Sequence, residues 1–174
     1  MSYLVNPYMV IAPIVPITYT QSTQSSSVVY VEGVANKKIA GEQCVNSSSL
    51  LFGKKITNIQ FRGQRQNSIG GNLHARHYAS DNSIKYTYWT IVAQTLPTSE
   101  SWVNPTGYVG SDEVFATGDY FGFEYDDTDL YVVSYYGTPA SRFDGTNSIY
   151  IEVNHSGSAT TASTQDMCFT ITVV

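Results

Sequence analysis

A chain of 174 residues, 42% of them hydrophobic, is long enough to form one domain with its own core. Only 13% of the residues are charged and the net charge is −5, which argues against nucleic-acid binding because that function needs clustered Lys and Arg. The 14 tyrosines are typical of β-sandwiches and of surfaces that bind through aromatic and hydroxyl contacts.

The chain begins with an uncharged apolar segment, MSYLVNPYMVIAPIVPITY, and its first charged residue is Glu32. No basic residue precedes Lys37, which argues against a signal peptide because such a peptide starts with a basic region. Pro7, Pro13 and Pro16 would interrupt a membrane-spanning helix and favour extended backbone instead. We therefore expect no membrane partner.

A polar, uncharged stretch, TQSTQSSS, follows at residues 20–27 and is typical of a flexible spacer. The apolar segment is then either a first strand that pairs locally or an arm that docks on a neighbouring subunit, since exposed apolar surface of this size is unfavourable in a soluble monomer. We predict an arm and spacer at 1–27, a domain at 28–174, and a folded sandwich with weakened assembly after deletion of residues 1–19. The predicted contact residues are Tyr3, Leu4, Val5, Tyr8, Val10, Ile11, Ile14, Val15 and Ile17.

The rest of the chain has a strand pattern throughout. No window keeps a 3.6-residue apolar period, so we expect almost no helix. Short apolar runs are separated by turn residues, which favours an all-β fold, an antiparallel jelly-roll β-sandwich. The predicted strands are 28–34, 54–63, 72–79, 84–93, 112–116, 119–125, 130–136, 148–154 and 167–174.

Motifs of enzymes are missing from the sequence: it has no G-x-S-x-G, H-E-x-x-H, P-loop or Rossmann glycine pattern. His74 and His77 are three positions apart in a predicted strand and therefore point to opposite faces, so they cannot act as a pair. His77 shares a face with Leu73 and Ala75 and is interpreted as a semi-buried packing residue. We expect the protein not to be an enzyme and to have no cofactor.

One acidic loop is the only candidate for a metal site. Asp126, Asp127 and Asp129 could bind a hard cation such as calcium through carboxylate oxygens, although a solvated turn between two strands explains them as well. Cys44 and Cys168 lie too far apart in the sequence to indicate a metal site. Cys168 is expected to be a buried free thiol, and a disulfide between the two stays open.

Two aromatic groups are candidates for glycan contact. Trp102 and Tyr108 lie in or near a Pro-bounded loop, PTSESWVNPTGY, where Trp102 is either an exposed aromatic or a buried anchor. In the predicted strand 84–93, Trp89 should face away from Tyr86 and Tyr88, so one set is expected in the core and the other at the surface.

The segments LLFGKKITNIQFRGQRQ, GGNLHARHYASDNS and TGDYFGFEYDDTDLYVVSYY resemble a jelly-roll pattern, within residues 50–136. The pattern is similar to the carbohydrate-binding-module-like sandwiches of virion proteins in tailed phages and other viruses, and the N-terminal segment resembles the arms by which virion proteins hold their neighbours. The resemblance implies a structural protein of a virus particle (a capsid, decoration or tail component) with copies of itself and other virion proteins as partners. The alternatives are a carbohydrate-binding or receptor-binding module that recognises a surface glycan, and a subunit of an extracellular filament. The expected location is the virion, or else an extracellular surface.

Overall fold

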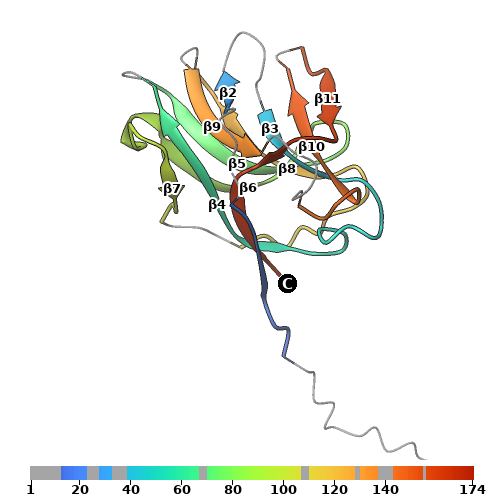
Figure 1. The fold of residues 1–174 in the computed structure, drawn as a ribbon. Helices are drawn as coiled ribbons and strands as arrows, with labels where there is room; N and C mark the ends of the chain where they lie inside the picture. The colour runs from blue at the N-terminus through green and yellow to red at the C-terminus, as the bar shows by residue number, and fades with distance from the viewer. Residues whose placement is uncertain are drawn as a thin grey trace, which may run out of the picture.

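The chain forms two antiparallel β-sheets, consistent with a β-sandwich, and the predicted all-β fold is confirmed (Figure 1). The only helical turn in the described part of the chain is the 3-10 turn η1 at Ala93–Thr95. The computed structural model describes residues 13–22, 28–32, 39–66, 70–106, 110–127, 130–136, 143–154 and 156–174.

The first sheet has seven strands. Its main order is β1-β13-β4-β9-β12, with β2 pairing β9 and β7 pairing β4, and all of these pairings are antiparallel. The first strand of the chain therefore lies beside the last one. The bounds are β1 Ile17–Gln21, β2 Val28–Glu32, β4 Ile56–Arg65, β7 Ser101–Val103, β9 Leu130–Tyr136, β12 Asp166–Met167 and β13 Phe169–Val173.

The second sheet has six strands in the order β11-β10-β3-β8-β5-β6, again with antiparallel pairing throughout. Along the chain, successive strands often change from one sheet to the other, so most of the contacts join distant parts of the sequence. The bounds are β3 Ile39–Cys44, β5 Asn72–Tyr78, β6 Ile84–Val92, β8 Tyr120–Tyr125, β10 Ser148–Val153 and β11 Ala159–Ala162.

The main core lies between the two sheets and is rich in aromatic rings. Phe61 of β4 packs on Phe123 of β8 with ring centroids 5.1 Å apart, and Phe121 of β8 meets Phe169 of β13 edge-on at 5.0 Å. Such aromatic pairs contribute roughly 0.5–1.5 kcal/mol each beyond the area that they bury. The sheets are therefore joined by ring packing.

The prediction for strand β6 was wrong in one respect, because Tyr88 and Trp89 are both buried in this core. The pairing of β5 with β6 shifts register between Ala75 and Arg76, whose partners are Trp89 and Thr87, so Tyr88 is the extra residue of a β-bulge. A bulge breaks the two-residue alternation of side chains, and both rings therefore enter the core.

The predicted strand at 112–116 was also wrong: it holds only a single bridge, between Phe115 and Phe52. Conversely, β3 was not predicted, because its sequence IAGEQC has no apolar run. It is nevertheless an inner strand of its sheet, and Glu42 is buried with a carboxylate oxygen accepting the Met167 backbone N–H at 3.0 Å. The strands β1, β7 and β11 were not predicted either.

Both cysteines are buried free thiols, which confirms the expectation for Cys168 and places no disulfide between Cys44 and Cys168. Burial raises the pKa of Cys168 to about 11, and burial likewise raises the pKa of Cys44. Neither thiol is therefore ionised near neutral pH, and neither has the lowered pKa of a reactive cysteine.

Candidate functional sites

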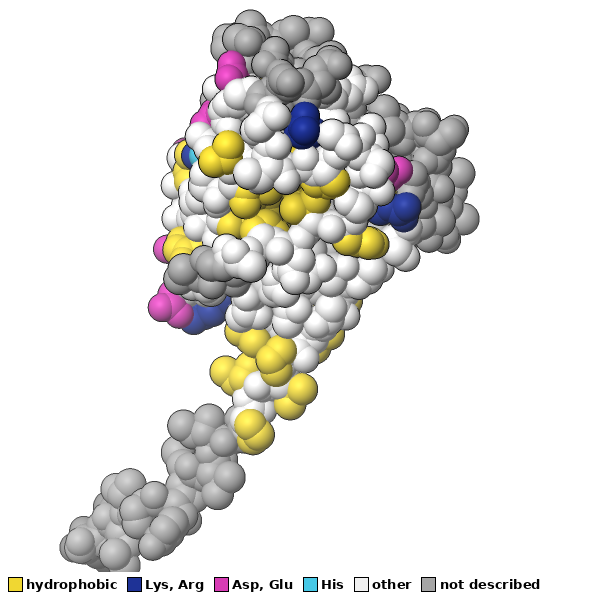
Figure 2. Space-filling view, turned by 90° about the vertical axis from the view of Figure 1, so that its left-hand side faces the viewer, with side chains coloured by type: hydrophobic (Ala, Val, Ile, Leu, Met, Phe, Trp, Pro, Cys, Tyr) yellow, Lys and Arg dark blue, Asp and Glu magenta, His cyan; other side chains and the backbone are white. Residues whose placement is uncertain are grey.

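The N-terminal segment leaves the sandwich as extended, exposed backbone from Pro13 to Pro16 (Figure 1). The exposed fraction is 73% for Ile14 and 72% for Val15, and it is still 44% for Ile17 at the start of β1. Figure 2 shows hydrophobic side chains gathered where the segment departs from the body. The other predicted contact residues lie outside the described residues: Tyr3, Leu4, Val5, Tyr8, Val10 and Ile11.

The segment joins the domain earlier than the sequence indicated. Residues 17–21 were assigned to the arm and the spacer, but they form β1, which pairs with β13 in the register Ile17 to Val173. Tyr19 meets the ring of Phe143 edge-on, with centroids 5.8 Å apart. Two of the five side chains of β1, those of Tyr19 and Gln21, pack on the domain, so β1 belongs to its sheet rather than to an arm or spacer. Residues 23–27 of the predicted spacer lie outside the described residues.

Trp102 is the exposed aromatic at the surface of the seven-stranded sheet. It lies on β7 opposite Arg62 of β4, and its exposed fraction is 39%. The Arg62 side chain forms an ion pair with Glu100 at 3.3 Å. Tyr108, the second predicted glycan contact, lies outside the described residues.

The acidic loop is anchored by hydrogen bonds. The carboxylate of Asp126 accepts the Asn72 backbone N–H at 2.5 Å, the Asn72 side-chain amide at 3.1 Å and the Nε2–H of His74 at 3.1 Å. Although partial burial raises the pKa of Asp126, the Asn72 and His74 contacts outweigh it, and the net shift is downward. Asp127 borders Gly70 and Gly71, and Asp129 lies outside the described residues. Among the residues that the structure describes, no group of three or more His, Cys, Asp and Glu side chains is placed to hold a metal ion.

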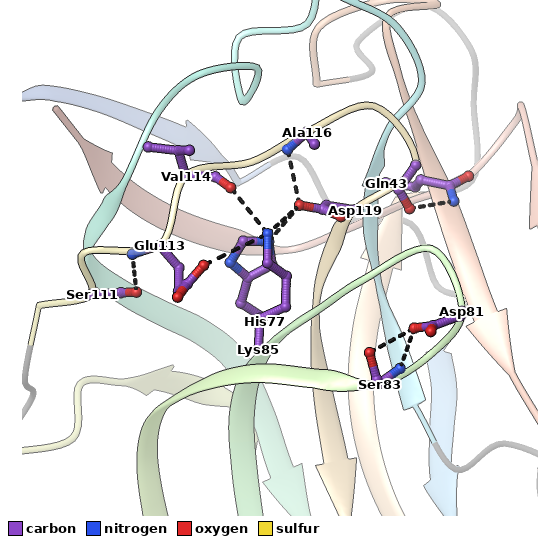
Figure 3. Close-up of polar contacts among 11 residues, drawn as sticks. Gln43, His77, Asp81, Ser83, Lys85, Ser111, Glu113, Val114, Ala116 and Asp119 are labelled. Atoms are coloured by element: carbon purple, nitrogen blue, oxygen red, sulfur yellow. Dashed lines mark hydrogen bonds and ion pairs between the residues drawn. The ribbon is translucent and has the colours of Figure 1, made fainter.

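A polar cluster around His77 joins strands β5 and β6 to the loop before β8 (Figure 3). His77 on β5 is 0% exposed and stacks on Phe115, with ring centroids 3.9 Å apart. Its Nε2–H donates to Asp119 Oδ2 at 3.1 Å, and the same oxygen accepts Lys85 Nζ at 3.0 Å and the Ala116 backbone N–H at 2.9 Å. Leu73 and Ala75 are buried with His77, as predicted, but the imidazole is fully buried rather than semi-buried.

The electrostatics of this cluster favour a neutral imidazole. Burial and the nearby Lys85 ammonium lower the pKa of His77 to about 4, despite the opposing effect of Asp119. Its Nδ1 atom has no hydrogen-bond partner among the described residues, so a proton there would be buried without an acceptor. Burial raises the pKa of Asp119, but the Ala116 N–H, Lys85 and His77 outweigh it and lower the pKa overall.

The cluster fixes the loop at 111–119 to the six-stranded sheet. Lys85 Nζ also contacts Glu113 at 3.7 Å and donates to the Val114 carbonyl at 3.3 Å. Together with Asp119, the Lys85 ammonium therefore binds three residues of this loop. The His77 ring presents no surface to solvent. This geometry makes His77 a packing and positioning residue, and no sequence motif links it to Asp119, which lies 42 residues further along.

A small hollow lies on the outer face of the six-stranded sheet. It has a volume of about 120 Å³ and lies beneath two turns, which are joined by the hydrogen bond from the Asn82 side-chain amide to the Gly157 carbonyl at 3.0 Å. At its edge, Glu124 accepts the Tyr78 hydroxyl at 2.9 Å and pairs with Arg76. The lining residues are Ile39, Tyr78, Asn82, Ile84, Glu124, Val153, Asn154 and Gly157.

Comparisons with protein-family models, curated proteins and solved structures found no match to this chain. Within the described ranges, no helix is long and apolar enough to cross a membrane.

Proposed function

We propose that this protein is a structural subunit that assembles with other subunits through its N-terminal apolar segment. The observation that carries the proposal is the exposure of Ile14, Val15 and Ile17 on extended backbone that leads away from the domain (Figures 1 and 2). Burying these three side chains against a neighbour would contribute roughly 5 kcal/mol, at about 1.5–3 kcal/mol for each fully buried aliphatic side chain. Pro13 and Pro16 keep the segment extended and so suit it to reach another molecule.

The same proposal places the assembly in a virus particle, as a capsid, decoration or tail component. This step is supported by the sequence resemblance across residues 50–136 and by the uncharged N-terminal segment. It includes a jelly-roll arrangement of the sandwich, which the pairing of the first strand with the last and the frequent change of sheet between successive strands support. The proposed partners are copies of this chain and other virion proteins.

The test is to remove the segment without touching β1. A chain lacking residues 1–16 should keep the unfolding transition of the full chain, because β1 starts at Ile17. It should sediment as a smaller species than the full chain at the same concentration. The full-length variant I14S/V15S should show the same loss, and V92S, which removes an exposed aliphatic side chain elsewhere, should not. Unchanged sedimentation after deletion would contradict the proposal.

A second candidate function is glycan binding at Trp102. The exposed indole lies opposite Arg62 of β4, and an aromatic ring beside a polar side chain suits a sugar ring and its hydroxyl groups. Glycan-array binding by the wild-type chain, lost in W102A and kept in F52A, would support it. Phe52 is an exposed aromatic on a different loop and is a matched control. Absence of binding, or binding that W102A leaves unchanged, would remove this candidate.

A further inference from the structure

The outer face of the six-stranded sheet carries a hydrophobic cluster of its own, separate from the core between the two sheets. Its members lie on the four neighbouring strands β10, β3, β8 and β5, and each is at most 3% exposed. They are Ile39, Tyr78, Tyr120, Ile151 and Val153. A sheet face that is turned away from the core is usually polar, so an apolar cluster there is a setting in which a ligand site can form.

The hollow beside this cluster is bordered by two turns. One turn joins β5 to β6 and the other joins β10 to β11, and the hydrogen bond from the Asn82 side chain to the Gly157 carbonyl links them at 3.0 Å. The volume of the hollow is about 120 Å³. An engineered cavity of roughly 150 Å³ binds benzene, so this hollow has room for a small organic group.

One part of its lining is aliphatic. Val153 of β10 and Ile39 of β3 are cross-strand partners, and both are almost completely buried. Ile84 of β6 lies opposite Tyr78 of β5 and is 52% exposed. The lining therefore offers buried methyl groups and one aliphatic side chain that is open to solvent, which together suit a methyl group of a ligand.

A carboxylate lies next to these aliphatic side chains. Glu124 of β8 is the cross-strand partner of Ile39 and lines the hollow. Its carboxylate accepts the Tyr78 hydroxyl at 2.9 Å and forms an ion pair with Arg76, so it is oriented and its charge is balanced. The two oxygens of a carboxylate accept several hydrogen bonds at once, so an N–H group of a ligand can join these contacts.

The remaining polar lining consists of two asparagine side chains. Asn82 Oδ1 accepts the Tyr120 hydroxyl at 2.9 Å, and Asn154 Oδ1 accepts the backbone N–H of Ser156 at 3.1 Å and that of Ser158 at 2.9 Å. Both side chains are held in place by their oxygen atoms. A primary amide carries two N–H donors, so these residues offer donors to a carbonyl oxygen of a ligand.

We propose that the hollow binds the acetamido group of an N-acetylated amino sugar. The methyl group packs against Ile39 and Val153, the N–H donates to the Glu124 carboxylate, and the carbonyl oxygen accepts an N–H of Asn154. The acetamido group is neutral and so leaves the ion pair of Glu124 with Arg76 intact, whereas a charged ligand would compete with it. The sugar ring stays at the mouth, beside Ile84. This inference goes beyond the proposed function, because assembly through the N-terminal segment does not use the hollow.

Titration of the isotope-labelled full chain with N-acetylglucosamine, followed by NMR, tests the ligand class. The amide signals of Asn82, Asn154 and Gly157 should shift, with a dissociation constant of about 1–10 mM because so small a group makes few contacts. Glucose lacks the acetamido group and glucosamine carries an ammonium group in its place, so neither should shift these signals at the same concentrations.

The other outcomes of this titration overturn the proposal. Equal binding of glucose would show recognition of ring hydroxyl groups, and binding of glucosamine alone would show a site for a cation. Shifts at Trp102 without shifts around the hollow would favour the second candidate function instead. No shift with N-acetylglucosamine would leave the hollow without this ligand.

Two variants locate the site. N154D keeps an oxygen that accepts the backbone N–H groups of its turn but removes the amide donors, so the dissociation constant should rise at least five-fold. N46D is the matched control, because Asn46 Oδ1 accepts the Ser48 backbone N–H at 2.8 Å in a different turn. Affinity for N-acetylglucosamine that N154D leaves unchanged would contradict the role of Asn154.

The aliphatic part of the lining is tested at an exposed position, where substitution should leave the unfolding transition close to wild type. I84S should raise the dissociation constant at least three-fold, and V92S, at a position of the same strand that is 55% exposed, should not change it. If N154D and I84S both bind N-acetylglucosamine as the wild type does, the hollow is not the binding site. Sedimentation of both variants should match that of the full chain, so these results are independent of the test of the N-terminal segment.

Discussion

His77 and Asp119 form a hydrogen bond of 3.1 Å at a position where the imidazole has no solvent exposure. The residues come from β5 and from the loop before β8, which are 42 positions apart in the sequence. The carboxylate orients the ring with Nε2 protonated, and Phe115 covers one face of the ring. The loop at 111–119 therefore depends on a neutral histidine.

The first prediction concerns the dependence of stability on pH. The folded-state pKa of His77 is about 4, below its ordinary value of 6.5, so the unfolded chain binds a proton at a pH where the folded chain does not. The free energy of unfolding should therefore fall as the pH drops from 6.5 to 4, by up to about 3 kcal/mol. Carboxylates with lowered pKa, such as Asp119 and Asp126, lose their contribution at lower pH, below about 3.8.

Urea unfolding of the wild type and of H77Q between pH 7.5 and 4.5 measures this slope. The variant should lose most of the slope in that window, because glutamine does not titrate. Titration of the His77 ring by NMR in the wild-type chain gives the pKa independently and does not require the variant to fold. Equal slopes in both proteins, or a ring pKa near 6.5, would contradict the neutral buried histidine.

The second prediction concerns Asp119, whose Oδ2 accepts three hydrogen bonds. D119N should lower the free energy of unfolding by about 2–3 kcal/mol, because it removes the carboxylate that accepts from the buried His77 ring and pairs with the partly buried Lys85 ammonium. D112N is the matched control, since Asp112 forms an exposed ion pair with Lys55 at 3.0 Å, and such pairs contribute about 0–1 kcal/mol. Urea midpoints of the two variants give the comparison, and an equal small effect would show that the Asp119 contacts are weak.

The all-β class could be predicted from the sequence because most strands carry apolar residues in alternation between turn residues. Strand β3 could not, since Gly41 and Glu42 look like surface residues and become internal only when β10, β8 and Met167 are assembled around them. The burial of both Tyr88 and Trp89 depends on a β-bulge, which no local sequence pattern predicts.

The candidate sites show the same limit. The sequence left open whether Trp102 is an exposed aromatic or a buried anchor, and the structure shows it exposed. The partnership of His77 with Asp119 depends on the sheet topology. The end of the N-terminal segment was misplaced by a few residues, because Thr18 was assigned to the apolar segment and Thr20 and Gln21 to the polar spacer. They form an edge strand whose polar face lies at the surface.

The third prediction concerns Trp89, which connects the two sheets. Its indole N–H on β6 donates to the Ile59 carbonyl of β4 at 2.9 Å, in addition to its packing against Phe61. W89F should lower the free energy of unfolding by about 2–4 kcal/mol, from a lost buried hydrogen bond and a smaller ring in a packed core. W102F, at the exposed tryptophan, should change it by less than about 0.5 kcal/mol. Similar effects of the two substitutions would contradict the buried bridge.

The fourth prediction concerns Gly41, at the centre of the six-stranded sheet between β10 and β8. A Cβ atom at this position would overlap the backbone carbonyl of Phe121 and approach the Cα of Gly122 at 2.6 Å. Backbone atoms of an inner strand cannot move aside without breaking their ladder, so G41A should lower the free energy of unfolding by about 3 kcal/mol or more. Gly110 is the matched control, because a Cβ atom there meets nothing within 4 Å and its backbone does not require glycine. G110A should therefore unfold at the wild-type urea concentration. If G41A also does so, the close approach of β3 and β8 at this point is wrong.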